Sequence, residues 1–207
     1  MKPVFVLACA CLCVAAAPQP PGPAPRDARL PFTAADGERF AQKYADVVRR
    51  APARAGQRRK PIQTIVTEPE INGYLRYHGK NVLPAGVVEP YVYALGAGRL
   101  SGEATVDLDA VRLSRPRGTL DPAQLLRGRL PVAATGVLRS KDGEFRFELE
   151  SATVAGLEVP KAILQELVSY YTKSAANPDG YSLDTPFTLS GGIREIAVES
   201  RRAIIIQ

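Results

Sequence analysis

From Val87 onward, the sequence alternates apolar and polar residues with a period of two, and this pattern restricts the fold more than any other feature. In the clearest run, Phe145, Phe147 and Leu149 alternate with charged residues. Successive side chains of a β-strand point to opposite faces, so such runs predict strands with one apolar and one wetted face. Turn-forming residues separate the runs, which favours an antiparallel sheet covered on one side. The predicted long strands are Val87–Leu95, Arg99–Leu113, Leu130–Arg139 and Glu144–Val154.

Two segments instead repeat apolar residues with a helical period. Residues 34–50 follow a capping Thr33 and predict an amphipathic N-terminal helix, and residues 161–174 follow Pro160 and carry a second apolar stripe. Long antiparallel strands and amphipathic helices must bury their apolar sides together, so the predicted fold class is α+β. The simplest packing wraps a curved antiparallel sheet around the helix at 161–174. A short helix should begin near Thr67, and short strands are expected at 62–66, 181–183, 187–189, 193–198 and 203–206.

The first 31 residues differ in composition from the rest of the chain. Lys2 precedes an apolar run of fourteen residues, and a proline-rich stretch follows. A positive start, a short apolar middle and a small-residue exit predict a secretory signal peptide at residues 1–17, too short to span a hydrocarbon core of ~30 Å. We expect a Pro-rich linker at residues 18–31 and one domain at residues 32–207, exported to the periplasm or cell envelope. A lipoprotein anchored through Cys9 is the alternative.

The composition excludes several kinds of chemistry. The chain has one histidine, and its three cysteines all lie in the first thirteen residues. A zinc site built from several His or Cys ligands is therefore excluded, as is a cysteine nucleophile once a leader is removed. A Ser-His-Asp hydrolase would need His78, and no G-x-S-x-G elbow is present. Asp107 and Asp109 should lie about 7 Å apart on the wetted face of a strand, and this position accounts for them without a catalytic or metal-binding role. We expect no enzymatic activity, no cofactor and no metal.

A basic stretch follows the N-terminal helix. Between residues 49 and 60 there are six basic residues and no acidic one, in a chain of formal charge +6. One interpretation is an anion-binding loop for phospholipid or a polymer, and the other is a solvated loop. Nucleic acid is not an expected partner, because no aromatic residues are interleaved and the protein is expected to be exported. The candidate anion-binding residues are Arg49, Arg50, Arg54, Arg58, Arg59 and Lys60.

Three stretches occur in an order that resembles a known family. They are Val66–Leu75 at a helix start, Val154–Pro160 before a helix, and Phe187–Ile196 before a final apolar strand. Over roughly residues 60–207, this order is similar to the bacterial exported LmeA-type phospholipid-binding proteins and related tubular lipid-binding (TULIP-like) domains. The resemblance implies a half-barrel in which a twisted antiparallel sheet wraps a long helix and acyl chains lie in the apolar seam.

The resemblance and the export pattern predict a cell-envelope protein that binds or handles lipid. Its expected ligand is a phospholipid or another acyl chain, with the membrane surface as a further partner. The same apolar residues could instead form an ordinary closed core. The alternative function is a non-enzymatic envelope scaffold that binds a protein or polymer through the basic loop or a sheet edge. The candidate seam residues are Leu164, Leu167, Val168 and Tyr171 on the helix, facing Val106, Leu108, Phe145, Phe147 and Leu149.

Overall fold

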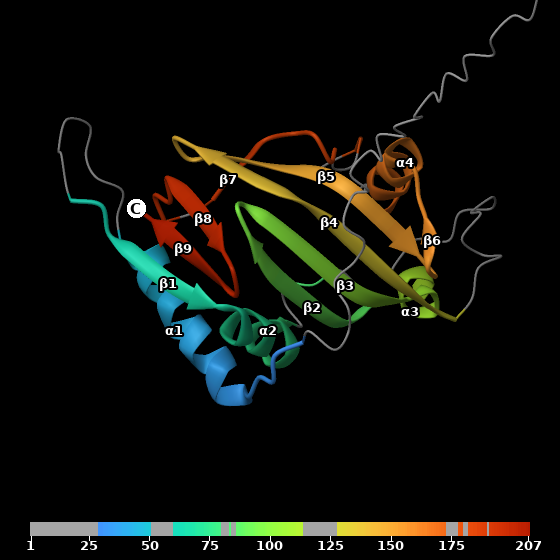
Figure 1. The fold of residues 1–207 in the computed structure, drawn as a ribbon. Helices are drawn as coiled ribbons and strands as arrows, with labels where there is room; N and C mark the ends of the chain where they lie inside the picture. Colours follow the sequence, from blue (N-terminus) through green and yellow to red (C-terminus); the bar gives the residue numbers. More distant parts are fainter. Residues whose placement is uncertain are drawn as a thin grey trace, which may run out of the picture.

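The computed structural model describes residues 29–50, 60–79, 83, 86–113, 128–172, 178–179, 182–189 and 191–207. The expected signal peptide, most of the expected linker and the candidate residues Arg54, Arg58 and Arg59 lie outside these ranges. Within them the fold is α+β, as predicted, with a six-stranded antiparallel sheet and a separate three-stranded sheet (Figure 1). The elements are α1 (Ala34–Arg49), β1 (Gln63–Thr67), α2 (Glu68–Tyr77), β2 (Val87–Gly96), β3 (Arg99–Asp107), α3 (Leu108–Leu113), β4 (Arg129–Lys141), β5 (Glu144–Val154), β6 (Leu157–Glu158), α4 (Lys161–Thr172), β7 (Phe187–Thr188), β8 (Glu195–Glu199) and β9 (Arg202–Ile206).

The larger sheet is a meander in which each strand pairs with the next one along the chain. Its order is β2-β3-β4-β5-β6, and β7 pairs with the first residues of β5. Three of its connections are two-residue turns, at 97–98, 142–143 and 155–156, where both residues have positive φ. This geometry matches the natural twist of a hairpin, and the second residue of each turn is glycine. Among the described helices, none is long and apolar enough to cross a membrane.

The strand predicted to reach Leu113 ends earlier. β3 stops at Asp107, and the next six residues form α3, so the prediction is wrong for that part. The cause is local, because the Asp107 carboxylate accepts the backbone N–H groups of Asp109 and Ala110, both at 3.1 Å, as a helix cap does. Leu108 therefore does not lie on the sheet, and Asp107 and Asp109 do not share a strand face.

The small sheet pairs β1 with the two C-terminal strands and covers one end of the large sheet. Its order is β1-β9-β8, and Figure 1 shows it beside the large sheet, with α1 and α2 below it. Val47 of α1, Phe145 of β5 and Ile193 form a buried cluster at this junction. Ser140 of β4 also exchanges hydrogen bonds with the backbone of Ile196 at 3.1 and 3.2 Å. The apolar core is thus sealed where the two sheets meet.

The start of α2 closes the free edge of β2. Asn72 is 0 % exposed, and its side chain donates to the Val92 carbonyl at 2.9 Å and accepts the Val92 N–H at 2.7 Å. The buried Glu68 carboxylate accepts the Ala94 N–H at 3.1 Å and the Arg201 guanidinium at 2.8 Å. These side chains bind backbone groups of β2 that a neighbouring strand would otherwise use. Glu68 and Asn72 of the Val66–Leu75 stretch therefore have a structural role.

Helix α4 begins at the predicted residue and makes its main sheet contact with β5, at the end of the molecule away from the small sheet (Figure 1). Its side chains also hold the segment that follows. Gln165 accepts the Leu183 N–H at 2.7 Å, and Lys161 forms an ion pair with Asp184 at 2.6 Å. Residues 183–184 form a turn, so the strand predicted at 181–183 is wrong for the two residues that the structure describes.

Candidate functional site

The two faces of the large sheet differ in chemistry. Residues that lie opposite each other on antiparallel strands share a face, so the register assigns each strand residue to one side. The polar face carries side chains such as Glu103, Arg139 and Glu148. The apolar face comprises Leu100, Ala104 and Val106 of β3, Leu130, Val132, Ala134 and Leu138 of β4, and Phe145, Phe147, Leu149, Ala152 and Val154 of β5.

Burial of the apolar face changes along the strands. At the small sheet, Phe145 is 0 % exposed and packs against Val47. Among these residues of β3, β4 and β5, all but Phe145 and Ala152 are only half-buried, whereas Ala94 of β2, opposite Leu100, is buried. The apolar surface continues to β6, where Leu157 lies opposite Val154 and is 74 % exposed. An apolar surface left incompletely covered in this way is a common place for a ligand or partner to bind.

The predicted sheet residues of the seam fall into three groups. Val106, Phe147 and Leu149 all lie on the apolar face and are half-buried, but Val106 lies opposite Leu130, whereas Leu149 and Phe147 lie opposite Gly136 and Leu138, farther along β4. Phe145 lies on the same face, but it is sealed in the core between the two sheets. Leu108 belongs to α3, so its prediction as a strand residue facing the long helix is wrong. The incompletely covered part of this face therefore begins beyond Phe145.

Of the four seam residues predicted on the helix, the structure describes the side chains of two. Leu164 and Val168 are half-buried, whereas the side chains of Leu167 and Tyr171 lie outside the described part of the chain. Ile163, one residue before Leu164, is 51 % exposed. Helix α4 thus contributes apolar surface next to β5 that its described neighbours do not fully cover.

The basic candidates that the structure describes do not form a common site. Arg49 is paired with an aspartate of its own helix, and its side chain is well exposed. Arg50 donates to the Thr64 hydroxyl at 3.1 Å and to the Gln207 side chain at 3.0 Å, so it ties α1 to the small sheet. Lys60 is exposed at the start of the next described segment.

The single histidine joins two helices. His78 ends α2, and its Nε2 lies 3.2 Å from Oε1 of Glu38 in α1. Its ring stacks on Tyr74, with centroids 5.4 Å apart. Among the described residues, no group of three or more His, Cys, Asp or Glu side chains is arranged to hold a metal ion.

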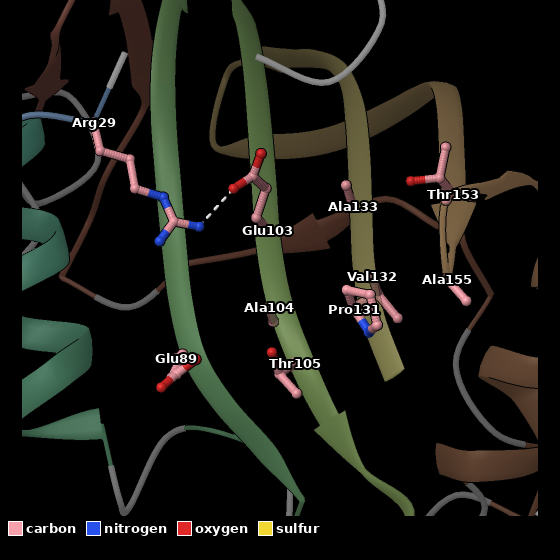
Figure 2. Close-up of a pocket in the computed structure, with 11 residues that line it drawn as sticks. Arg29, Glu89, Glu103, Ala104, Thr105, Pro131, Val132, Ala133, Thr153 and Ala155 are labelled. Carbon is pink, nitrogen blue, oxygen red and sulfur yellow. Dashed lines mark hydrogen bonds and ion pairs between the residues drawn. The ribbon is translucent and has the colours of Figure 1, made fainter. Parts of the chain in front are cut away.

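On the polar face, the first described residues of the chain are bound to β2 and β3. Arg29 donates to the Glu103 carboxylate at 2.6 Å, as Figure 2 shows, and to the Tyr93 hydroxyl at 3.2 Å. The Leu30 N–H donates to the Tyr91 hydroxyl at 2.7 Å. Sequence analysis missed this site, because Arg29 falls in the expected linker and nothing in its local sequence indicates a partner.

Burial and hydrogen bonding raise the pKa values of Tyr91, Tyr93 and Arg29. Burial, and then the hydrogen bond to Glu68, raise the pKa of Tyr91 to about 12. Burial also raises the pKa of Tyr93, and the hydrogen bond to Glu103 raises the pKa of Arg29. Both phenols therefore stay neutral and the guanidinium stays charged at any physiological pH.

The large sheet thus offers two candidate binding surfaces, one on each face. The first is the half-buried apolar face beside α4. The second is a cavity of about 530 Å³ on the polar face, lined in part by Arg29, Glu89 and Glu103 (Figure 2). In comparisons with protein-family models, curated proteins and solved structures, nothing matches this chain.

Proposed function

We propose that this protein binds an acyl chain, as part of a phospholipid or another lipid, on the apolar face of the large sheet. The observation that carries this proposal is the incomplete burial of that face. Val106, Phe147 and Leu149 belong to this apolar face, yet the described residues around them leave each one only half-buried. Covering such surface contributes about 25 cal/mol per Å² of apolar area, so a ligand that lies along it gains binding energy.

Helix α4 provides the second side of the proposed seam. Leu164 and Val168 are half-buried and Ile163 is largely exposed, on a helix that packs against β5. Each buried methylene of a ligand contributes about 0.8 kcal/mol, so ten of them offer about 8 kcal/mol before the costs of association are subtracted. A single acyl chain can therefore supply useful affinity without a polar anchor.

The core between the two sheets sets the inner limit of this seam. Phe145 and Val47 are both fully buried there, and a ligand would have to displace them to pass. The ring of Phe147 lies over Gly136 of β4, where an added Cβ would come within 2.6 Å of that ring. The lipid chain is thus proposed to run from Phe147 toward Leu157, over the less buried end of the sheet.

The sequence adds support for the ligand class and the location. The three stretches that resemble the LmeA-type and TULIP-like proteins favour lipid as the ligand, and the N-terminal pattern favours an exported, cell-envelope protein without enzymatic activity. The finer fold assignment, a TULIP-like half-barrel in which the sheet curves around α4, is part of the same proposal.

The test compares two β5 variants on opposite faces of the sheet. Leu149→Asp places a charge on the apolar face, whereas Arg146→Asp places the same residue on the polar face, opposite Arg139. The full chain is purified without detergent and titrated with a fluorescent fatty acid. We expect Leu149→Asp to weaken binding by about tenfold or more, and Arg146→Asp to change it less than about twofold. Equal affinity of the two variants, both with native circular dichroism, would contradict the proposal.

A further inference from the structure

We propose that the cavity on the polar face is a second binding site, which takes a small organic cation such as an aliphatic amine. Its volume is about 530 Å³, and its floor includes Ala133 of β4. Since polar and apolar faces lie on opposite sides of one sheet, this inference does not depend on lipid binding. It rests on the shape of the cavity, on its charge and on the position of Glu89.

The cavity has a low floor between two higher walls. Glu103, Ala133 and Thr153 lie opposite one another on β3, β4 and β5, and Figure 2 shows them in a row across the three strands. Neighbouring strands are about 4.8 Å apart, so the two walls stand roughly 10 Å apart across the short alanine side chain. A slender aliphatic chain fits this width, and the walls offer it a carboxylate and a hydroxyl.

Glu89 enters the lining because of an irregularity in β2. Val88 pairs with Thr105 and Tyr91 with Glu103, so two residues of β2, Glu89 and Pro90, lie opposite one residue of β3. Such a bulge redirects side chains, and proline is compatible with it because its nitrogen cannot donate to the ladder. Glu89 also has a φ of 52°, outside the usual range for a strand.

This backbone conformation distinguishes Glu89 from the other residues of its kind. The remaining described non-glycine residues with positive φ, at positions 97, 142, 155 and 201, lie in tight turns between strands, where such values are ordinary. Glu89 lies within a strand instead. Strain of this type persists where the surrounding structure imposes it, and it is frequent at binding sites. Here it places Glu89, an exposed residue, in the lining of the cavity.

The charges of the lining favour a cation. Its charged side chains among the described residues are Arg29, Glu89 and Glu103, and one guanidinium with two carboxylates leaves a formal charge of −1. Arg29 is paired with Glu103, whereas Glu89 is exposed to solvent and its carboxylate has no hydrogen bond or ion pair within the described part of the chain. An amine can pair with Glu89, and the hydroxyls of Thr105 and Thr153 can accept its other N–H groups. An anion would meet the uncompensated carboxylate.

The experiment titrates the full chain with 1,6-diaminohexane and with the neutral 1,6-hexanediol, by calorimetry at low ionic strength. We expect the diamine to bind and the diol to bind at least about tenfold more weakly, because charge-assisted hydrogen bonds are lost. Glu89→Gln should weaken diamine binding by a similar factor. Glu195→Gln, which removes one exposed carboxylate on β8 outside the cavity, should leave it unchanged.

Two further results separate this site from the lipid seam. Ala133→Leu should abolish diamine binding because its side chain fills the floor, and Leu149→Asp should leave diamine binding intact. Wild-type protein that does not bind the diamine, or equal affinities for Glu89→Gln and Glu195→Gln, would overturn the proposal. Lipid binding could still hold in that case, because the fatty-acid titration measures it on the other face.

Discussion

The side-chain amide of Asn72 forms two hydrogen bonds with the backbone of Val92, so a helix residue completes the edge of the large sheet. Without Asn72, the N–H and the carbonyl of Val92 would be free to pair with another strand. Asn72 is fully buried, and it also donates to the Glu68 carbonyl at 3.0 Å. The contact between α2 and β2 therefore depends strongly on one amide.

Replacing Asn72 should be costly. Asn72→Leu leaves the N–H and the carbonyl of Val92 without partners, and each unsatisfied group costs about 1–3 kcal/mol. We expect the free energy of unfolding to fall by about 3 kcal/mol, measured by urea denaturation. Gln63→Leu, at an exposed amide of β1, should change it by less than about 0.5 kcal/mol. A loss at Asn72 no larger than that at Gln63 would show that water replaces the amide.

Two glycines of the apolar face should respond differently to the same substitution. At Gly136, an added Cβ would clash with the backbone carbonyl oxygen of Glu148 and come within 2.6 Å of the Phe147 ring, whereas at Gly102 it would meet nothing within 4 Å. Gly136→Ala should therefore destabilise the protein by about 2 kcal/mol and weaken fatty-acid binding. Gly102→Ala should leave the melting temperature nearly unchanged. Equal melting temperatures for the two variants would show that both the β5 backbone at Glu148 and the Phe147 ring move away without cost.

The Glu70 carboxylate should make stability depend on acid pH. Burial acts to raise its pKa, but the hydrogen bonds from Lys43 and from the Thr67 N–H outweigh burial, so the pKa lies below its ordinary value of 4.5. A pKa lowered by folding contributes stability above the ordinary value, and this contribution is lost as pH falls through the folded-state value.

Urea unfolding between pH 7 and pH 3 tests this dependence. The free energy of unfolding of the wild type should decrease in the acid range, and Glu70→Gln should show a smaller decrease. Glu195→Gln, at an exposed site, should follow the wild-type curve. If Glu70→Gln also follows that curve, the link from Lys43 of α1 to α2 contributes nothing to pH dependence.

Removing Arg29 should affect the cavity more than the fold. The ion pair with Glu103 is partly exposed and is worth no more than about 1 kcal/mol. Arg29→Met leaves Glu103 uncompensated, so diamine affinity should rise by roughly threefold or more. Arg49→Met removes the same charge from α1 and should leave the affinity unchanged. Weaker diamine binding by Arg29→Met would mean that Arg29 positions the ligand instead.

The local patterns of the sequence located most elements. Alternation is a property of neighbouring residues, so β5 was predicted from Glu144 to Val154 with its observed bounds. The end of β3 was missed, because the alternation of Val106 and Leu108 suggested a strand where the Asp107 side chain caps a helix instead.

Pairings between distant residues could not be predicted in the same way. The separate small sheet depends on Val66 lying opposite Ala203, and the sequence between them gives no sign of that pairing. The cavity depends on Arg29 reaching Glu103 and on a bulge that turns Glu89, which are tertiary features. Half-burial of the apolar face is likewise a result of packing, since the same alternation would fit a closed core.

Native mass spectrometry of the full chain, expressed with its own N-terminus and purified without detergent, tests the central claim most directly. We predict one bound acyl-chain lipid per protein, identifiable after solvent extraction, retained by Arg146→Asp and lost from Leu149→Asp. A mass without ligand that stays unchanged after incubation with phospholipid vesicles would contradict the account.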